Sequence, residues 1–522
     1  MRKELDTIGY AFVGRVLAIK MKKEHSVTFN FIMNFILTAS AFIFPLITFP
    51  YVSRVLLPVG NGKIASATAV ITYFSMVSML GIPTYGIRAC AQVRDDKEKL
   101  SRTVQEILFI NIIMTVLVYG AFGASLYLVP KFAEDRTLLL VISTTILLNM
   151  IGVNWLYSAL EEYAYITVIS LIFKVIGVIL MFLFVHDTGD YIIYGGITVI
   201  SNVGSYLFNF LRLGKYISLK PVGNYNFRKH LKPIGIFCAM TVATSIYTNL
   251  DIVMLKFISG DEQAGYYNAA VKIKTIVTSL VTSIGTVLLP RLSYYIEKGM
   301  QQEFKRMASK ALGFVALMSL PLTVYFTMFA EESIGLLSGT AYQPAAWPMR
   351  LIMPTVIFIG LSNILGMQIL VPTDREQEVL TSMIAGAITD LLLNILLIPK
   401  LGASGASIGT LAAEWVVVLV QMQVLRTFLA EVKKDFKLFY YIAGLLPASL
   451  AAWVVRYALA PVVSGMFSLE KSCFVILAAT AALFFGIYGI VLLFLKEPIT
   501  MEYIFPYLKK LGQWMPKKKE EG

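Results

Sequence analysis

The sequence predicts an all-α protein that crosses a membrane many times, on two observations. First, its 522 residues are 57% hydrophobic and 15% charged, with a mean hydropathy of +0.72, whereas soluble proteins are about 25% charged. Second, the apolar residues form about fourteen long blocks, and a helix needs roughly 20 mostly apolar residues to cross a bilayer. The blocks lack the alternating polarity of membrane β-strands. We therefore expect about fourteen transmembrane helices.

Each block is expected to form one span, at about residues 29–57, 64–87, 104–129, 138–160, 163–185, 191–211, 234–258, 268–289, 311–329, 345–370, 379–398, 404–425, 439–459 and 473–495. Lys and Arg gather in alternate connections, about 30 on one side and about five on the other, and the basic side faces the cytoplasm. Both termini are therefore expected in the cytoplasm, with the protein in the inner, cytoplasmic membrane. The formal charge of +13 mostly reflects this asymmetry.

A weak internal repeat relates the two halves of the chain. Residues 62–67 (GKIASA) resemble residues 265–270 (GYYNAA), 203 positions later, and the same offset places Arg88 on Arg291. Six expected spans separate the copies, an even number, so both copies insert in the same direction and form a parallel repeat about an axis along the membrane normal. We expect two six-helix lobes with a cleft between them. The alternative is that small residues recur wherever helices pack closely.

The expected organisation is a cytoplasmic amino-terminal segment (1–28), a first lobe (29–211), a linker (212–232), a second lobe (233–427), two appended helices (428–496) and a basic tail (497–522). The amino-terminal segment interleaves apolar and charged residues, as does a helix that lies on a membrane surface. The connections between spans are too short to form a catalytic domain. We therefore expect a carrier rather than an enzyme.

Cysteine and histidine offer no recognisable catalytic or metal-binding pattern. Cys90, Cys238 and Cys473 lie far apart without ligand spacing, and solitary loop histidines such as His230 are expected to be solvated. We therefore expect no metal site and no cofactor. The basic charge is scattered over short loops instead of covering one face, which argues against nucleic-acid binding.

Basic residues inside the apolar blocks are candidates for a substrate site, because an ionisable group at the bilayer centre costs at least about 2.5–3.5 kcal/mol unless it meets a cavity or a partner. They outnumber the acidic ones, which suits an anionic substrate. Lys174 is the strongest candidate because it lies deep in its span. The full set is Lys174, Arg54, Lys272, Lys274, Arg350 and Lys256. Lys272 and Lys274 are about 200° apart around a helix, so we expect only one of them to face the cavity.

Acidic residues, prolines and rim arginines complete the candidate set. Asp251, Asp390 and Glu414 can pair with the cations or bind a coupling proton or sodium ion, and pairing is the simpler interpretation. Pro45, Pro50, Pro83 and Pro354 are candidate hinges, since proline frees backbone groups and bends a helix, although static kinks are the commoner result. Arg88 and Arg291 are expected at the cytoplasmic rim.

Several segments together resemble the polysaccharide repeat-unit flippases (Wzx-type), which share a superfamily with multidrug and toxin extruders (MATE-like) and lipid II flippases. The segments are 51–56 (YVSRVL), 81–88 (GIPTYGIR), 154–157 (NWLY), 251–255 (DIVML), 265–270 (GYYNAA), 287–293 (VLLPRLS) and 397–407 (LIPKLGASGAS). They are spread over almost the whole chain in the family's order. Leu57 stands where a glycine is usual, and Asp390 occupies a position that is usually uncharged.

The resemblance implies transfer of a polyprenyl-diphosphate-linked oligosaccharide from the cytoplasmic to the outer leaflet by alternating access. The intramembrane cations would then hold the diphosphate, the lipid bilayer would surround the carrier, and a polysaccharide polymerase or other glycan-assembly protein would be a partner. A cation-coupled drug or metabolite exporter of the same architecture is the main alternative. Membrane enzymes of glycan assembly and purely structural proteins are further alternatives.

Overall fold

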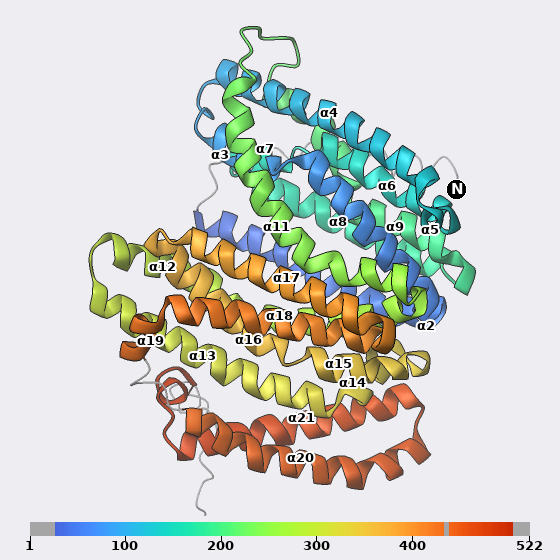
Figure 1. Ribbon diagram of the computed structural model, residues 1–522, viewed down its shortest axis with the longest axis vertical. Coiled ribbons are helices and arrows are strands. Elements are labelled where there is room, and N and C mark those ends of the chain that lie inside the picture. Colours follow the sequence, from blue (N-terminus) through green and yellow to red (C-terminus); the bar gives the residue numbers. More distant parts are fainter. Residues whose placement is uncertain (1–26, 433–437, 505–522) are drawn as a thin grey trace, which may run out of the picture.

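A computed structural model describes residues 27–432 and 438–504, and within these ranges the chain is helical without strands (Figure 1). Ten of the described helices are long and apolar enough to cross a membrane, or up to eleven if the pair Thr188–Val203 and Ser205–Lys215, bent by 41°, is one span. The predicted multi-span helical protein is therefore confirmed, whereas the count of fourteen spans stays a prediction. The expected surface helix and most of the basic tail lie outside the described residues.

The principal helices are, in chain order, α2 (Val27–Met79), α3 (Ile82–Ala91), α4 (Lys97–Leu128), α5 (Pro130–Glu134), α6 (Arg136–Ile151), α7 (Asn154–Ala159), α8 (Tyr163–Phe184), α9 (Tyr191–Val203), α10 (Ser205–Leu211), α11 (Arg228–Ile258), α12 (Asp261–Glu297), α13 (Gln301–Met328), α14 (Ala330–Ser338), α15 (Ala346–Ile352), α16 (Thr355–Ser362), the π-helix η4 (Asn363–Leu370), α17 (Glu376–Leu401), α18 (Ala403–Val424), α19 (Arg426–Val432), α20 (Leu438–Met466) and α21 (Leu469–Phe494). Each expected apolar block coincides with one helix or with consecutive helices, apart from a few residues at ends and breaks, and the first two blocks share α2 and its continuation α3.

The helices are arranged in successive groups along the long axis of the molecule (Figure 1). Helices α3–α10, the first helical group, lie at one end, helices α12–α18, the second helical group, lie in the middle, and α20 and α21 lie at the other end. Helix α2 contacts α6 and α8 in the first group and α12 and α14 in the second, and α11 contacts α3 as well as α17. Helices α2 and α11 therefore connect the two groups.

Apolar side chains fill the space between helices and also cover their outer faces. Tyr157 in the first group and Tyr342 in the second are fully buried. On α4, by contrast, Val116 and Leu117 are 65% and 61% exposed. A soluble monomer rarely exposes large contiguous apolar patches, so these outward faces are explained by contact with lipid.

Helix α2 is broken at Leu57, whose backbone angles are φ 57° and ψ 178°. Glycine is essentially the only residue that adopts this region without strain, which gives a physical reason for the glycine that is usual here in the resembling family. The expected hinge residues Pro45 and Pro50 lie inside α2, and the break falls immediately before Pro58 instead.

The glycines of the sequence repeat lie against each other where α2 crosses α12. A Cβ atom on Gly62 would stand 1.7 Å from the Asp261 carbonyl oxygen, and one on Gly265 would stand 2.1 Å from the Pro58 carbonyl oxygen. Pro58 and Asp261 are separated by the same 203 positions as the two glycines. The contact is therefore reciprocal, as expected for surfaces related by a two-fold axis.

His230 is buried, which corrects the expectation of a solvated loop histidine. The side chain is 2% exposed, its Nε2 lies 2.8 Å from Glu106 Oε2, and its Nδ1 shares a 2.5 Å hydrogen bond with the Tyr85 hydroxyl. Glu106 also pairs with Lys229 at 2.7 Å and accepts a 2.6 Å hydrogen bond from the Asn226 amide. These contacts tie the end of the linker to α3 and α4.

Candidate functional site

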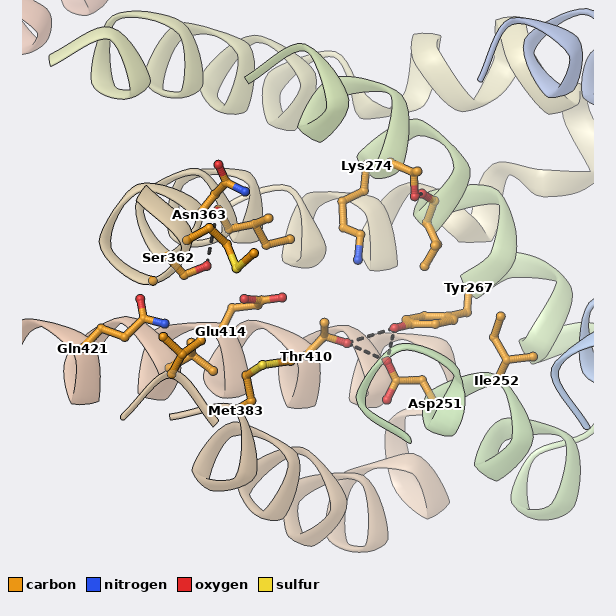
Figure 2. A pocket seen from close by; sticks show the side chains of 17 residues that line it. Asp251, Ile252, Tyr267, Lys274, Ser362, Asn363, Met383, Thr410, Glu414 and Gln421 are labelled. Carbon is orange, nitrogen blue, oxygen red and sulfur yellow. Dashed lines mark hydrogen bonds between the residues drawn. The ribbon is translucent and has the colours of Figure 1, made fainter. Parts of the chain in front are cut away.

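A pocket of about 500 Å³ lies among the helices of the second group (Figure 2). Its walls come from α11, α12, α16, η4, α17 and α18. The volume is within the range of small-molecule and cofactor pockets in proteins, roughly 300–1,000 Å³. One wall is the π-helix η4, and π-helical turns often occur at functional sites because they rearrange backbone hydrogen bonding.

Asp251 is the centre of a polar cluster at one end of this pocket. Its carboxylate accepts hydrogen bonds from Asn394 Nδ2 at 2.6 Å, from Thr410 Oγ1 at 2.8 Å and from the Tyr267 hydroxyl. Asp251 is 4% exposed, and no basic side chain of the described residues lies within ion-pair distance of it. The sequence analysis favoured a cationic partner for Asp251, but three neutral side chains donate hydrogen bonds to its carboxylate instead.

Asp390 lies beside this cluster and is 1% exposed. Neither of its carboxylate oxygens, nor the side-chain oxygen of Asn394, has a hydrogen-bond donor among the described residues. A Cβ on Gly409 would stand 2.4 Å from that Asn394 oxygen and 3.2 Å from Asp390 Oδ1. Because Gly409 has no side chain, there is room beside it for the Asn394 and Asp390 oxygens, which lack donors among the described residues. Such a pair of oxygens could coordinate a cation.

The cluster is suited to a monovalent cation or a proton. Two carboxylates, an amide oxygen and a hydroxyl lie together at this end of the pocket. Oxygen ligands are those that hard cations prefer. The structure therefore brings Asp251 and Asp390 together with Asn394 and Thr410, two neutral residues that the search for charges missed.

Lys274 and Glu414 enter the same pocket from opposite walls. Figure 2 shows the Lys274 ammonium and the Glu414 carboxylate directed into the space between α12 and α18. Glu414 is 6% exposed. Of the two neighbouring lysines, Lys274 lines the pocket, whereas Lys272 is half-buried on another face of α12.

Lys174 lies in the first helical group, in the middle of α8. Its ammonium donates a 2.6 Å hydrogen bond to Ser40 Oγ on α2 and lies 5.8 Å from the centre of the Phe44 ring. Lys174, Lys272 and Lys274 have no carboxylate within ion-pair distance among the described residues. A hydroxyl and an aromatic face are weak partners for a charge at this depth.

Three other cations predicted from the sequence, Arg54, Arg350 and Lys256, form ion pairs and do not line the pocket. Arg54 Nε lies 2.6 Å from Glu470 Oε1, and Arg54 also donates a 2.6 Å hydrogen bond to the Leu336 carbonyl. Arg350 lies 2.7 Å from Glu331. Both charges are therefore compensated by protein carboxylates in this structure, and their expected role in a substrate site stays a prediction.

Lys256 belongs to a cluster that joins helices of both groups. Its ammonium pairs with Asp135 at the start of α6 and, at 2.6 Å, with Asp261 at the start of α12. Lys63 on α2 reaches the other oxygen of Asp135 at 3.1 Å. We call Lys63, Asp135, Lys256 and Asp261 the outer latch, because the charge pattern of the loops predicts that this end faces away from the cytoplasm.

The expected hinges and rim residues have different surroundings. Pro83 lies in the first turn of α3, after Gly81 with φ 74°, and Pro354 lies in the break between α15 and α16. Arg88 is exposed on α3. Arg291 lies in α12, but its side chain is outside the described residues.

Comparison with known proteins identifies the family. Residues 27–296 match the profile of the polysaccharide biosynthesis protein family, more than half of the chain. The chain belongs to that family. The match confirms the predicted resemblance at the level of a polysaccharide biosynthesis family.

Curated relatives and solved structures extend the likeness. A protein named "Putative O-antigen transporter" from Escherichia coli K12 is 24% identical over 76% of this chain and 96% of its own length. One of the same name from Shigella dysenteriae is 25% identical over 76% and 99%. The structure of the lipid II flippase MurJ in an inward closed conformation superimposes with a TM-score of 0.68 over 89% of this chain and all of that chain, at 14% identity. This last likeness shows the fold.

Proposed function

We propose that this chain is a flippase that moves a polyprenyl-diphosphate-linked oligosaccharide repeat unit from the cytoplasmic to the outer leaflet by alternating access. Family membership and relatives named as O-antigen transporters over three quarters of the chain support a lipid-linked glycan as the substrate. The glycan would serve cell-surface polysaccharide synthesis, and the protein would occupy the inner membrane with both termini in the cytoplasm.

The distribution of paired and unpaired cations carries this proposal. Arg54, Lys256 and Arg350 are compensated by carboxylates. Lys174, Lys272 and Lys274 lie inside helices of the membrane region and have no such partner among the described residues. A cation at membrane depth needs an anion or water, and the diphosphate of a lipid-linked sugar is an anion that would enter from the membrane.

Two helical groups and their contacts support the proposed movement. Residues 29–211 and 233–427 would form the two lobes, joined by the linker 212–232 and followed by α20 and α21. The reciprocal contact of Gly62 and Gly265 supports a parallel repeat, whose halves can rock about a shared axis. Moving negative charge outward is favoured by a negative-inside potential, by about 2.3 kcal/mol per charge per 100 mV.

A coupling cation would bind at Asp251 and Asp390. The donorless oxygens of Asp390 and Asn394 support this assignment, because buried acceptors without donors are unfavourable unless a cation or proton reaches them. Return of the empty carrier would then be linked to cation binding. A polysaccharide polymerase would receive the product on the outer side.

The test is transport of a fluorescent polyprenyl-diphosphate oligosaccharide in proteoliposomes, with and without an imposed negative-inside potential. Protein-dependent transfer that accelerates with the potential is the expected result. Vesicles containing the Lys174→Ala protein should transfer less lipid, and Lys174→Arg should restore transfer. Absence of lipid transfer by the parent protein under all conditions would reject the flippase proposal.

A cation-coupled exporter of the same architecture is the second candidate function. It is favoured by the composition of the pocket, where Asp251 and Glu414 face a single lysine, Lys274. An acidic pocket suits a cationic drug or metabolite. Movement of such a cation, with no movement of lipid-linked oligosaccharide in the same vesicles, would favour this alternative.

A further inference from the structure

The pocket in the second helical group is elongated along α18. Thr410, Glu414 and Gln421 all line it, and their spacing of four and seven residues places them on one face of the helix. The rise of 1.5 Å per residue separates Thr410 from Gln421 by about 16 Å along the axis. In Figure 2, the Asp251 cluster lies at one end, Gln421 at the other and Glu414 between them.

Gln421 provides a donorless oxygen at the far end of this pocket. The residue is 2% exposed. Its side-chain nitrogen donates a 3.1 Å hydrogen bond to Ser382 Oγ, and the Ser382 hydroxyl itself donates to the Val379 carbonyl at 2.7 Å. This chain of donors fixes the orientation of the amide. The Gln421 oxygen is therefore left without a donor among the described residues.

Glu414 follows the Asp251 cluster in series along the same face. Thr410, which donates a 2.8 Å hydrogen bond to Asp251, lies one helical turn before Glu414. A cation leaving Asp251 and Asp390 toward Gln421 would therefore meet the Glu414 carboxylate next. The charged and titratable side chains that line this route are Asp251, Tyr267, Lys274 and Glu414. Asp390 does not line the pocket and lies close to Asn394, a residue that donates to Asp251.

We infer that Glu414 forms a second binding position for a monovalent cation, on the route by which the cation enters and leaves the Asp251–Asp390 site. This inference rests on the proposed coupling and adds a path to it. The end of the route at Gln421 lies near the last turn of α18, on the side that the loop charges predict to be cytoplasmic. A proton and a sodium ion share the required chemistry, because either is attracted to a carboxylate inside the membrane region.

The experiment compares equilibrium binding with exchange in the full-length protein reconstituted in lipid nanodiscs. Radiolabelled sodium is bound at alkaline pH, and its release is followed after dilution into unlabelled sodium; acidic pH tests competition by protons. The variants are Asp390→Asn, Glu414→Gln and Glu414→Asp. The matched control is Glu378→Gln, which removes a partly exposed carboxylate of α17 that pairs with Arg375 and does not line the pocket. Thermal unfolding of each variant verifies folding.

Asp390→Asn should abolish saturable sodium binding at the Asp251–Asp390 site. Glu414→Gln should leave that site fully occupied at saturating sodium but slow release from it about tenfold or more. Glu414→Asp should recover most of the release rate, and Glu378→Gln should match the parent. Release by Glu414→Gln at the parent rate would overturn the inference. Loss of all binding in Glu414→Gln would also overturn it, because Glu414 would then belong to the Asp251–Asp390 site itself.

Two further outcomes separate this inference from the proposed function. If the parent binds no sodium, proton uptake reported by a pH-indicator dye is measured on the same variants, and the same order of effects supports the route with a proton as the cation. Lipid transfer by a parent protein that binds neither cation would overturn the route and leave the flippase proposal standing.

Discussion

Replacing Asp135 by Asn should open the outer latch. The carboxylate is 4% exposed and pairs with Lys63 from α2 and with Lys256 from α11. Asn keeps the shape of the side chain but removes its charge, so the two ammonium groups lose their common partner. Lys256 retains Asp261, whereas the link between α6 and α11 loses its charge pairing.

The size of the effect follows from the burial of the pair. Removing one partner of a buried ion pair costs about 3–5 kcal/mol, and the lower value applies here because Lys256 keeps a second carboxylate and is 10% exposed. If the cost falls on the closed arrangement alone, about 3 kcal/mol shifts the balance between closed and open arrangements roughly a hundredfold, since each 1.4 kcal/mol is a factor of ten.

The assay is the rate at which a membrane-impermeant maleimide modifies Ser53→Cys in a background lacking the three native cysteines. Ser53 on α2 is fully buried, and its hydroxyl lies 3.2 Å from the Leu337 carbonyl on α14. We expect Asp135→Asn to raise the labelling rate at least about tenfold. Glu431→Gln, which removes a surface ion pair with Lys305, is the control. Equal labelling rates in Asp135→Asn and the control would refute the reasoning.

Three further predictions concern the backbone and the substrate site. Leu57→Gly should raise the free energy of unfolding by about 1 kcal/mol, because relief of a strained φ outweighs the flexibility that glycine adds to the unfolded chain; unchanged or lower thermal stability in detergent would contradict this. Gly265→Ala should lower stability by about 1–3 kcal/mol or more, since its Cβ would stand 2.1 Å from a carbonyl oxygen. The control Gly120→Ala on α4, with no atom within 4 Å of the added carbon, should be neutral or stabilising. Equal melting temperatures of the two variants would exclude the proposed close contact. Lys174→Ala should reduce lipid transfer more than Lys174→Arg does, and equal transfer by both variants and the parent would remove Lys174 from the site.

Hydropathy alone was sufficient to predict an all-helical protein with many membrane spans, because a membrane span imposes a long apolar block on any sequence that forms it. The repeat offset aligned Gly62 with Gly265 but did not predict that the two glycines meet, because contact between repeat copies depends on how the helices cross. The break at Leu57 was signalled only as a departure from a family pattern. Its cause, a positive φ, is a property of the folded backbone that a single sequence does not display.

Partners across the fold could not be predicted in the same way. Arg54 and Lys256 are as prominent in the sequence as Lys274, yet their carboxylate partners Glu470 and Asp135 are distant in the chain. The cradle beside Asp390 depends on Asn394 and on the absence of a side chain at Gly409. A search for charges passes over such neutral residues. Polar residues spaced by three or four positions on α17 and α18 were the available signal.

The reciprocal crossing of α2 and α12 has a consequence for the origin of the chain. When a surface contacts its own repeat-related copy, one surface forms both sides of the interface. A second, different surface does not have to evolve as its partner. Two separate half-length chains could therefore have made the same crossing as a dimer before a gene duplication joined them. Separate expression of the two halves, cut within residues 212–227, would show whether the crossing still assembles a complete carrier without a covalent link.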